Sequence, residues 1–380
     1  MSMELSEEHR MIKQMVREFA LGEVKPLARE LDETGEVNWD LYKKMAELGL
    51  LGMPFPEEWG GGDTDTLGYT IGVEEISRVC GSTGLSMAAH TSLGTYPIYE
   101  FGTEEQKKKY VPDLASGRKL GGFGLTEPGA GSDAGGTQTT AVKDGDHYVL
   151  NGTKCFITSA GVGETFVVTA ATDKEAGAHG ITAFIVEKRM PGFKAGKKEN
   201  KLGCRGSDTG ELIFEDCRVP AENMLGEENQ GFKIFLHTLD GGRISIGAMA
   251  LGIAQGALDA SIEYAKERKQ FGRPIAKFGA IYDMIADMAT EIEAARLLVY
   301  DASVKKDRGE AYSIPSAMAK LFASEVAMRA SRTAIQIYGG YGYMLDYDVN
   351  RFWRDAKITT IGEGTSEVQR LVIGRHLLGR

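Results

Sequence analysis

Cysteine and histidine are scarce in this chain, and neither is spaced for structural chemistry. The four cysteines, Cys80, Cys155, Cys204 and Cys217, form no CxxC pair, so we expect neither a disulfide framework nor a thiolate metal site. The six histidines contain no HxxxH or HExxH spacing, which removes the usual imidazole ligands of zinc. The sequence therefore predicts a site without a metal.

Long apolar runs and excess positive charge are also missing. We find no window approaching about 18 uncharged apolar residues, so we expect no membrane span. Residues 1–20 are amphipathic and lack the apolar centre of a secretory signal, which favours the cytoplasm. The 44 Lys and Arg residues are outnumbered by 54 Asp and Glu residues, for a formal net charge of -10. This balance argues against bulk nucleic-acid binding.

The 380 residues divide into three regions that differ in the spacing of their apolar residues. This length suits two or three packed domains. Residues 1–120 show mainly helical periodicity, residues 121–228 alternate as strands do, and residues 229–380 return to the helical period. Long helices are expected at 247–268, 280–307 and 315–338. Because strands and helices are segregated along the chain, the fold class is α+β, mainly α, rather than a doubly wound Rossmann sheet.

The middle region carries strand patterns separated by turn dipeptides. Strands are expected at 148–150, 165–169, 181–186 and 211–214. The dipeptides Asp144-Gly145, Asn151-Gly152 and Pro191-Gly192 predict turns between them.

Two segments of the middle region could face a flat ligand. Phe123 to Asp133 reads FGLTEPGAGSD, where glycines allow close backbone approach and hydroxyls supply hydrogen-bond donors. Lys154 to Thr158 reads KCFIT, where an aromatic ring and a hydroxyl two residues apart could contact one ring system. Taken singly, the first is more often a plain glycine-rich loop and the second an ordinary strand with a core phenylalanine.

Three further segments lie in the C-terminal region. Arg268 to Pro274 places cations where a long helix ends, suited to a pyrophosphate or simply to the helix dipole. Gln336 to Tyr343 has paired glycines that could face an anion or cap a helix. Glu363 lies between Gly362 and Gly364 after an apolar-rich stretch. Burial there would raise its pKa toward that of a general base, although an isolated Glu between glycines is usually a loop residue.

Taken together, in this order and spacing, these segments resemble the acyl-CoA dehydrogenase family, most closely its short-chain, butyryl-type members. The resemblance runs from Leu5 to Arg380 and rests on FGLTEPGAGSD, KCFITSAG, RKQFGRPIAKF, QIYGGYGY and IGEGTSEVQRLVIGRHLL. It implies an N-terminal helical domain, a middle β-barrel-like domain and a C-terminal four-helix bundle. It also implies a homotetramer, a dimer of dimers, with non-covalent FAD partly held by a neighbouring subunit.

The resemblance also assigns roles to individual residues. The expected FAD-binding residues are Phe123, Leu125, Thr126, Ser132, Phe156, Thr158, Arg268, Gln270, Phe271, Gln336, Gly339, Gly340, Thr365 and Glu367. The expected acyl-CoA contacts are Ser132, Asp240, Arg243 and Gly364. Glu363 matches the catalytic base, which removes the α proton while the β hydrogen passes as hydride to flavin N5. Electrons would then pass to an electron-transfer flavoprotein, as in fatty-acid β-oxidation.

Several positions refine the expected subclass. Gly242 stands where isovaleryl-type and long-chain members carry their base, so the base falls to Glu363 and a straight short acyl chain is favoured. Gly84 lies where glutaryl-type members have an arginine, which disfavours an anionic acyl end. Gly362, Gly279 and Asp348 replace a frequent tyrosine, glutamine and proline. The loss of the tyrosine would widen the pocket and admit a cyclic, aryl or branched acyl group.

Other functions share parts of this pattern. An acyl-CoA oxidase would be longer, and a nitroalkane oxidase would carry an aspartate where Glu363 stands. The same site run in reverse would be an enoyl-CoA reductase. A non-catalytic flavoprotein of the same fold would have lost the base or the FAD contacts.

Overall fold

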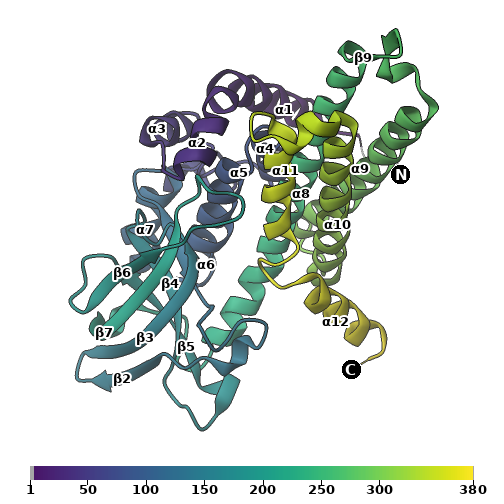
Figure 1. Cartoon of the computed structure of the whole chain (residues 1–380). Coiled ribbons are helices and arrows are strands. Elements are labelled where there is room, and N and C mark those ends of the chain that lie inside the picture. The colour runs from purple at the N-terminus through teal and green to yellow at the C-terminus, as the bar shows by residue number, and fades with distance from the viewer. Residues whose placement is uncertain (1–3, 380) are drawn as a thin grey trace.

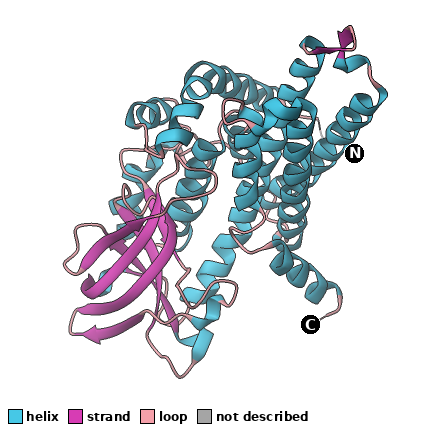
Figure 2. Ribbon diagram, viewed as in Figure 1, coloured by secondary structure: helices cyan, strands magenta, loops and turns pink. Residues whose placement is uncertain are grey.

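The computed structural model describes residues 4–379. Helices and strands occupy separate parts of the molecule, with the strands gathered in one lobe beside the helices (Figure 2). The N-terminal part is helical and starts where Ser6 caps α1 by accepting a hydrogen bond from the His9 backbone N–H at 3.1 Å. Its helices are α1 (Glu7–Phe19), α2 (Ala28–Thr34), α3 (Trp39–Glu47), α4 (Thr66–Ser77), α5 (Gly81–Ala88), α6 (Tyr96–Phe101) and α7 (Glu104–Ala115). A π-helical stretch (Ala89–Thr95) joins α5 to α6.

The middle part is one eight-stranded sheet with the order β6-β7-β3-β2-β4-β5-β8, to which β1 adds by pairing with β4 in parallel. Its strands are β1 (Gly121–Gly124), β2 (Thr140–Asp144), β3 (His147–Thr158), β4 (Thr165–Ala171), β5 (Ile181–Glu187), β6 (Phe193–Lys198), β7 (Thr209–Pro220) and β8 (Met224–Leu225). The Asp144-Gly145 and Pro191-Gly192 turns form as predicted, each with its glycine at positive φ.

The turn predicted at Asn151-Gly152 is wrong, because β3 runs straight through these residues, opposite a bulge in β7. The Asn151 side chain makes the bulge possible. It donates from Nδ2 to Asp216 Oδ1 at 3.1 Å and accepts from the Asp216 backbone N–H at 2.8 Å. These bonds replace the ladder contacts that the extra residue interrupts.

The C-terminal part is a bundle of long helices beside the sheet (Figure 1). Its elements are α8 (Gly231–Glu267), β9 (Lys269–Gln270), β10 (Arg273–Pro274), α9 (Gly279–Asp307), α10 (Ser313–Tyr338), α11 (Asp348–Thr359) and α12 (Ser366–Leu377). The α8 helix begins well before the residue 247 predicted from periodicity. Together with the N-terminal helices and the sheet, the bundle confirms the predicted α+β, mainly helical fold.

One hydrophobic core unites the N-terminal helices with the bundle, and α4 and α5 pack directly on α8. A second core fills one side of the sheet, and a third joins α6, α7 and α8 to β4 and β5. The α8 helix is long and apolar enough by composition to cross a membrane, but 83% of its most apolar window is buried inside the protein. Its hydrophobicity is that of a central core helix.

Candidate active site

The Glu363 loop joins α11 to α12 in an unusual backbone conformation. Glu363 has φ of 55° and Gly364 has φ of 92°, two successive residues in left-handed conformations. A side-chain-bearing residue adopts this region at a cost of about 1 kcal/mol, and such strain concentrates at functional sites. Gly364 also has no room for a side chain, because a Cβ there would lie 2.7 Å from Gln369 Nε2.

Two buried side chains hold this loop from outside. Gln369 of α12 donates from Nε2 to the carbonyl oxygens of Glu363 at 3.1 Å and of Gly364 at 3.0 Å. Lys320 of α10 donates from Nζ to the Gly364 carbonyl at 2.6 Å. Because both donors are fully buried, the loop is fixed by groups that water does not replace.

The Glu363 side chain reaches back onto α8 at Gly242. A Cβ added to Gly242 would lie 2.0 Å from Glu363 Oε2 and 2.9 Å from Leu93 Cδ2. The carboxylate therefore rests directly over the Gly242 backbone, with Leu93 beside it. Positions 242 and 363, the two alternative places expected for a base, therefore lie in direct contact.

The surroundings of this carboxylate favour proton transfer. Burial raises the pKa of Glu363 to about 7, against the opposing positive charges of Lys320 and Arg243. Oε2 is buried and has no hydrogen-bond partner among the described residues. A carboxyl group with a pKa near neutrality and a free oxygen atom can take up a proton from a bound ligand.

Asp240 and Arg243, predicted to engage the CoA arm, both stand on α8, and the positive charge of Arg243 acts on the Glu363 carboxylate. Arg243 Nη1 donates to Asp240 Oδ1 one helical turn earlier. Arg243 Nε is buried and lacks a hydrogen-bond partner among the described residues. The ion pair therefore leaves a donor available for a ligand that approaches α8.

The KCFIT segment, Lys154 to Thr158, forms the last five residues of β3. Phe156 does not join the hydrophobic core. Phe156 stands at a bulge of β3, with φ of 60° and 66% of its surface exposed. Thr158 follows on the same strand. The exposed ring excludes the ordinary interpretation of a core phenylalanine and leaves a flat apolar surface for a ligand ring.

The glycine-rich segment begins in β1 and continues as a loop beside β3. The Phe123 ring stacks on Phe235 of α8 with centroids 4.0 Å apart, which ties the sheet to the bundle. Leu125 and Thr126 follow half-buried, and Ser132 is exposed. Cβ atoms added at Gly129 or Gly131 would have no neighbour within 4 Å, so the backbone of this loop is open to a ligand.

A buried ion pair, which the sequence analysis missed, joins these two segments. Lys154 Nζ donates to Glu127 Oε1 at 2.7 Å, to the Leu125 carbonyl at 3.2 Å and to Thr169 Oγ1 at 2.9 Å. Glu127 in turn accepts backbone hydrogen bonds from Gln138 and Thr139. The pair fixes the glycine-rich loop on β3. The sequence could have indicated it, because each of the two motifs contains one of the two opposite charges.

A second group of predicted FAD residues lies far from the sheet within this chain. The β9–β10 hairpin stands at the outer end of the bundle, away from the strands (Figure 1). There the Arg268 guanidinium lies 5.3 Å from the Tyr341 ring centroid, and Phe271 is 93% exposed. The exposed residues of this group are Gln270, Phe271, Gln336, Gly339 and Gly340. One chain therefore does not bring both groups onto one ligand.

Two predicted residues stand at the start of α12, directly after the Glu363 loop. The Thr365 side chain caps the helix by accepting from the Val368 backbone N–H at 3.3 Å. Glu367 is exposed in the first turn. Both are thus placed by the same turn that positions Glu363.

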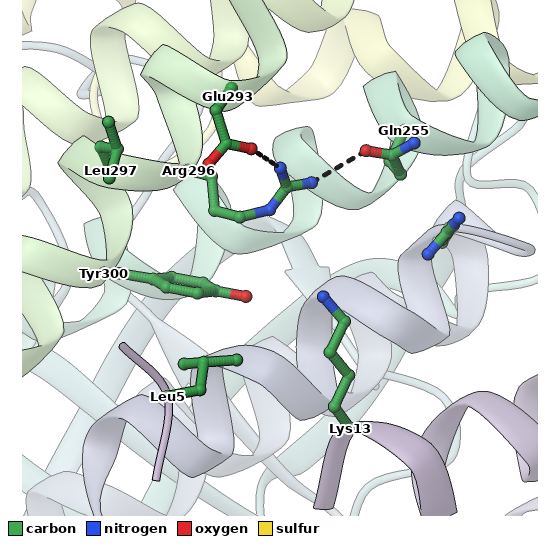
Figure 3. Close-up of a pocket in the computed structure, with 8 residues that line it drawn as sticks. Leu5, Lys13, Gln255, Glu293, Arg296, Leu297 and Tyr300 are labelled. Atoms are coloured by element: carbon green, nitrogen blue, oxygen red, sulfur yellow. Dashed lines mark hydrogen bonds and ion pairs between the residues drawn. The ribbon is translucent and has the colours of Figure 1, made fainter. Parts of the chain in front are cut away.

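The structure also contains a polar cavity of about 370 Å³ among α4, α8, α9 and the N-terminal segment. Figure 3 shows Arg296 bonded there to Glu293 and to Gln255 Oε1, the latter at 2.8 Å. Arg296 also donates to the buried Glu74 of α4. These charges are satisfied within the protein and hold three helices together, and Glu363 does not line this cavity.

Comparison with known proteins finds matches to one family along nearly the whole chain. Residues 6–118, 122–217 and 229–378 match the N-terminal, middle and C-terminal domains of acyl-CoA dehydrogenase. The chain is 56% identical over 379 residues to the probable acyl-CoA dehydrogenase YngJ of Bacillus subtilis, covering 100% of both. It is 55% identical to a short-chain specific acyl-CoA dehydrogenase of Clostridium acetobutylicum, covering 98% of each. It is also 49% identical to the acryloyl-CoA reductase (NADH) of Anaerotignum propionicum, covering 100% of this chain and 97% of that protein.

Solved structures give the same result. Butyryl-CoA dehydrogenase from Megasphaera elsdenii superposes with a TM-score of 0.97 at 49% identity, covering 100% of both chains. A chain from work on the electron transferring flavoprotein of Acidaminococcus fermentans gives 0.98 at 54% identity, again covering 100% of both. An acyl-CoA dehydrogenase from Bacillus anthracis complexed with FAD gives 0.93 at 39%, covering 100% of this chain and 68% of that one. The chain therefore belongs to the acyl-CoA dehydrogenase family of flavin-dependent oxidoreductases.

Proposed function

We propose that this enzyme uses FAD to dehydrogenate a short-chain acyl-CoA to the trans-2-enoyl-CoA, with Glu363 as the base. The observation that carries the proposal is the Glu363 carboxylate, seated over Gly242 with one buried, unbonded oxygen and a pKa raised to about 7 by burial. At neutral pH a substantial fraction of this group is ionised and can accept the α proton of a bound thioester.

The residues around the base have distinct parts in the reaction. Gln369 and Lys320 fix the loop, so that the carboxylate meets the substrate in one orientation. The backbone N–H of Glu363 is available to polarise the thioester oxygen, which stabilises charge as the α proton leaves. Asp240 and Arg243 hold the CoA arm along α8. FAD, when bound, supplies the redox chemistry by accepting the β hydrogen as hydride.

The surfaces described above suit FAD in two parts. Phe156, Thr158 and the open loop at Gly129 and Gly131 would hold the flavin end in one subunit. Arg268, Phe271 and the exposed Gly339-Gly340 pair would hold the pyrophosphate and adenosine end of a neighbouring subunit's FAD. This division accounts for the separation of the two groups within one chain.

The walls near Glu363 favour a short, uncharged acyl group. Leu93 packs against Gly242, and the buried Tyr69 donates from its hydroxyl to Ser245 Oγ at 3.2 Å. Gly84 has no room for a side chain, because a Cβ there would lie 2.0 Å from Ser77 Oγ. An arginine able to bind a distal carboxylate therefore does not fit at that position.

The test is anaerobic titration of the purified protein with butyryl-CoA, followed by hexanoyl-, isobutyryl-, glutaryl- and cyclohexanoyl-CoA. Butyryl-CoA should bleach the visible flavin band of the wild type. Glu363→Gln should retain FAD and remain yellow, whereas the control Glu310→Gln, at an exposed loop position, should bleach normally. Bleaching of Glu363→Gln at the wild-type rate would refute the assignment of the base.

The reverse reaction is a second candidate, supported by the similarity to acryloyl-CoA reductase. The site chemistry is the same in both directions, and the redox partner decides which one runs. Consumption of NADH in the presence of crotonyl-CoA and an added electron-transfer flavoprotein would identify a reductase. Butyryl-CoA oxidation that drives reduction of that flavoprotein would identify a dehydrogenase.

The assembly proposed here is a homotetramer in the cytoplasm, with an electron-transfer flavoprotein as redox partner. Exposed apolar side chains at the outer end of the bundle support association, because Phe271, Tyr343 and Leu345 are 93%, 81% and 76% exposed. The partner is supported by the similarity to the Acidaminococcus chain. Light scattering coupled to gel filtration tests the tetramer, and a monomer that retains FAD would contradict it.

A further inference from the structure

Lys320 is a buried lysine in the middle of α10, a position where an ammonium group is costly unless it has a function. Its side chain has no exposed surface, and Nζ donates to the Gly364 carbonyl at 2.6 Å. The α8 helix packs against this part of α10, since a Cβ on Gly247 would lie in ordinary contact, 3.7 Å, with the Ala319-Lys320 peptide.

The next turn of α10 fixes the end of α11 to the same helix. Ser324 donates its hydroxyl to the Thr359 carbonyl at 2.8 Å and to the Lys320 carbonyl at 2.6 Å. The loop that follows α11 is therefore held to α10 at two successive turns. The contact made by Lys320 is the nearer of the two to Glu363, because its acceptor is the carbonyl of Gly364, which has a left-handed conformation.

The titratable groups that face Glu363 come from three helices. Lys320 faces it from α10, and Arg243 faces it from α8 but shares its charge with Asp240. Tyr69 approaches from α4, with its hydroxyl engaged by Ser245 and burial raising its pKa far above the usual value. Gln369 of α12 is neutral. Lys320 is thus the cation in this set without a bonded carboxylate.

We propose that Lys320 is a positioning residue for the catalytic base, which both holds the Glu363 loop through Gly364 and keeps the carboxylate ionised by its adjacent charge. This inference rests on the proposed function of Glu363. Burial disfavours the carboxylate, and the ammonium opposes that effect. Burial also lowers the pKa of Lys320 to about 8, against the influence of Glu363, so the lysine is still mostly charged at neutral pH.

The test separates the charge from the hydrogen bond with three variants of the holoenzyme. Lys320→Gln removes the charge but retains a donor, Lys320→Met removes both, and Gln369→Met removes the neutral donor on the other side of the loop. The direct readout is the protonated-carboxyl band of Glu363 in infrared difference spectra, identified by its loss in Glu363→Gln and titrated without substrate. The pH profile of flavin reduction by butyryl-CoA is the second readout.

Both Lys320 variants should raise the midpoint of the Glu363 titration by about one unit. Reduction by butyryl-CoA should then slow about tenfold on the acid side of the profile. Lys320→Gln should recover its rate at alkaline pH, whereas Lys320→Met should retain a lower plateau. Gln369→Met should lower the plateau without moving the midpoint, because it carries no charge.

Unchanged midpoints in both Lys320 variants would overturn the proposal, as would an equal shift in Gln369→Met. If Lys320→Met does not fold, Lys320→Gln alone decides the charge effect. The infrared titration needs no turnover, so it reports on Lys320 even if Glu363 is not the base. Failure of the proposed function would appear separately, as normal bleaching of Glu363→Gln.

Discussion

Gly242→Ala is the sharpest perturbation that this site offers, because it adds a single methyl group directly beneath the base. That methyl would lie 2.0 Å from Glu363 Oε2 and 2.9 Å from both the carboxyl carbon and Leu93 Cδ2. Real Cβ contacts do not fall below 3.0 Å, so the oxygen must move by about 1 Å. The strained loop cannot follow easily, because Gln369 and Lys320 hold its backbone.

A displacement of about 1 Å at a reacting group lowers the rate about 100-fold, or about 2.7 kcal/mol of transition-state stabilisation. Folding should be nearly unaffected. The helix gains about 1 kcal/mol from replacing an interior glycine by alanine, which offsets the lower end of the about 1–3 kcal/mol that overpacking costs. We predict a folded, FAD-bound protein in which reduction of the flavin by substrate is slow.

The assay is anaerobic stopped-flow reduction of bound flavin by butyryl-CoA, normalised to FAD content. Gly241→Ala is the matched control, because its added methyl would meet only the flexible end of Lys306, at 3.2 Å. We expect the control to stay within about threefold of wild type, since the far end of a long side chain can shift by a few tenths of an ångström at little cost. A Gly242→Ala rate equal to wild type would show that the carboxylate does not work from this position.

Further predictions concern the base, its titration and the FAD loop. Glu363→Gln should slow flavin reduction about a thousandfold, the scale of a lost general base, with FAD content unchanged in the absorbance spectrum. Because the ionised carboxylate is the active form and burial raises its pKa to about 7, kcat/KM should fall below pH 7 and level off above it; a profile flat from pH 5 to 9 would contradict this. Lys154→Met should leave Glu127 buried without its cation, cost about 3–5 kcal/mol of stability in a denaturant titration, and release FAD on gel filtration. The double variant Lys154→Met, Glu127→Gln should recover part of that loss, and no recovery would mean that the pair is not coupled. Arg268→Ala should reduce FAD retention while leaving the stability of the apoprotein within about 0.5 kcal/mol; unchanged FAD content would count against its assigned role.

Much of the architecture could be predicted from local patterns. The period of apolar residues separated helical from strand regions, and the Asp144-Gly145 and Pro191-Gly192 turns formed as predicted. The errors arose where tertiary contacts override local preference. Asn151-Gly152 has turn composition, yet β3 continues through it, because Asn151 bonds to Asp216 at a bulge of the neighbouring strand β7. The long helix expected at 247–268 was too short at its start, because Gly241-Gly242 interrupts the helical pattern in the sequence whereas α8 runs through both residues.

The candidate site was found through its motifs, but several of its working residues were not. Lys154 and Gln369 stand inside quoted motifs and Lys320 stands in ordinary helical sequence, but a lysine or glutamine usually faces solvent and none of the three was singled out. Their burial is visible only once helices and strands pack together. The Phe156 ring likewise could have been core or exposed, and the bulge that turns it outward depends on the register with β7.

The sequence alone determined the order of the three regions, the separation of strands from helices and the presence of Glu363 between two glycines. These follow from periodicity and composition, which each segment carries by itself. Only the tertiary structure decided that Glu363 lies on Gly242, that Lys320 and Gln369 hold its loop, and that the two groups of predicted FAD residues lie apart within one chain. The physical reason is that periodicity records which face of an element is buried, whereas the partner of that face is chosen by packing among elements distant in sequence.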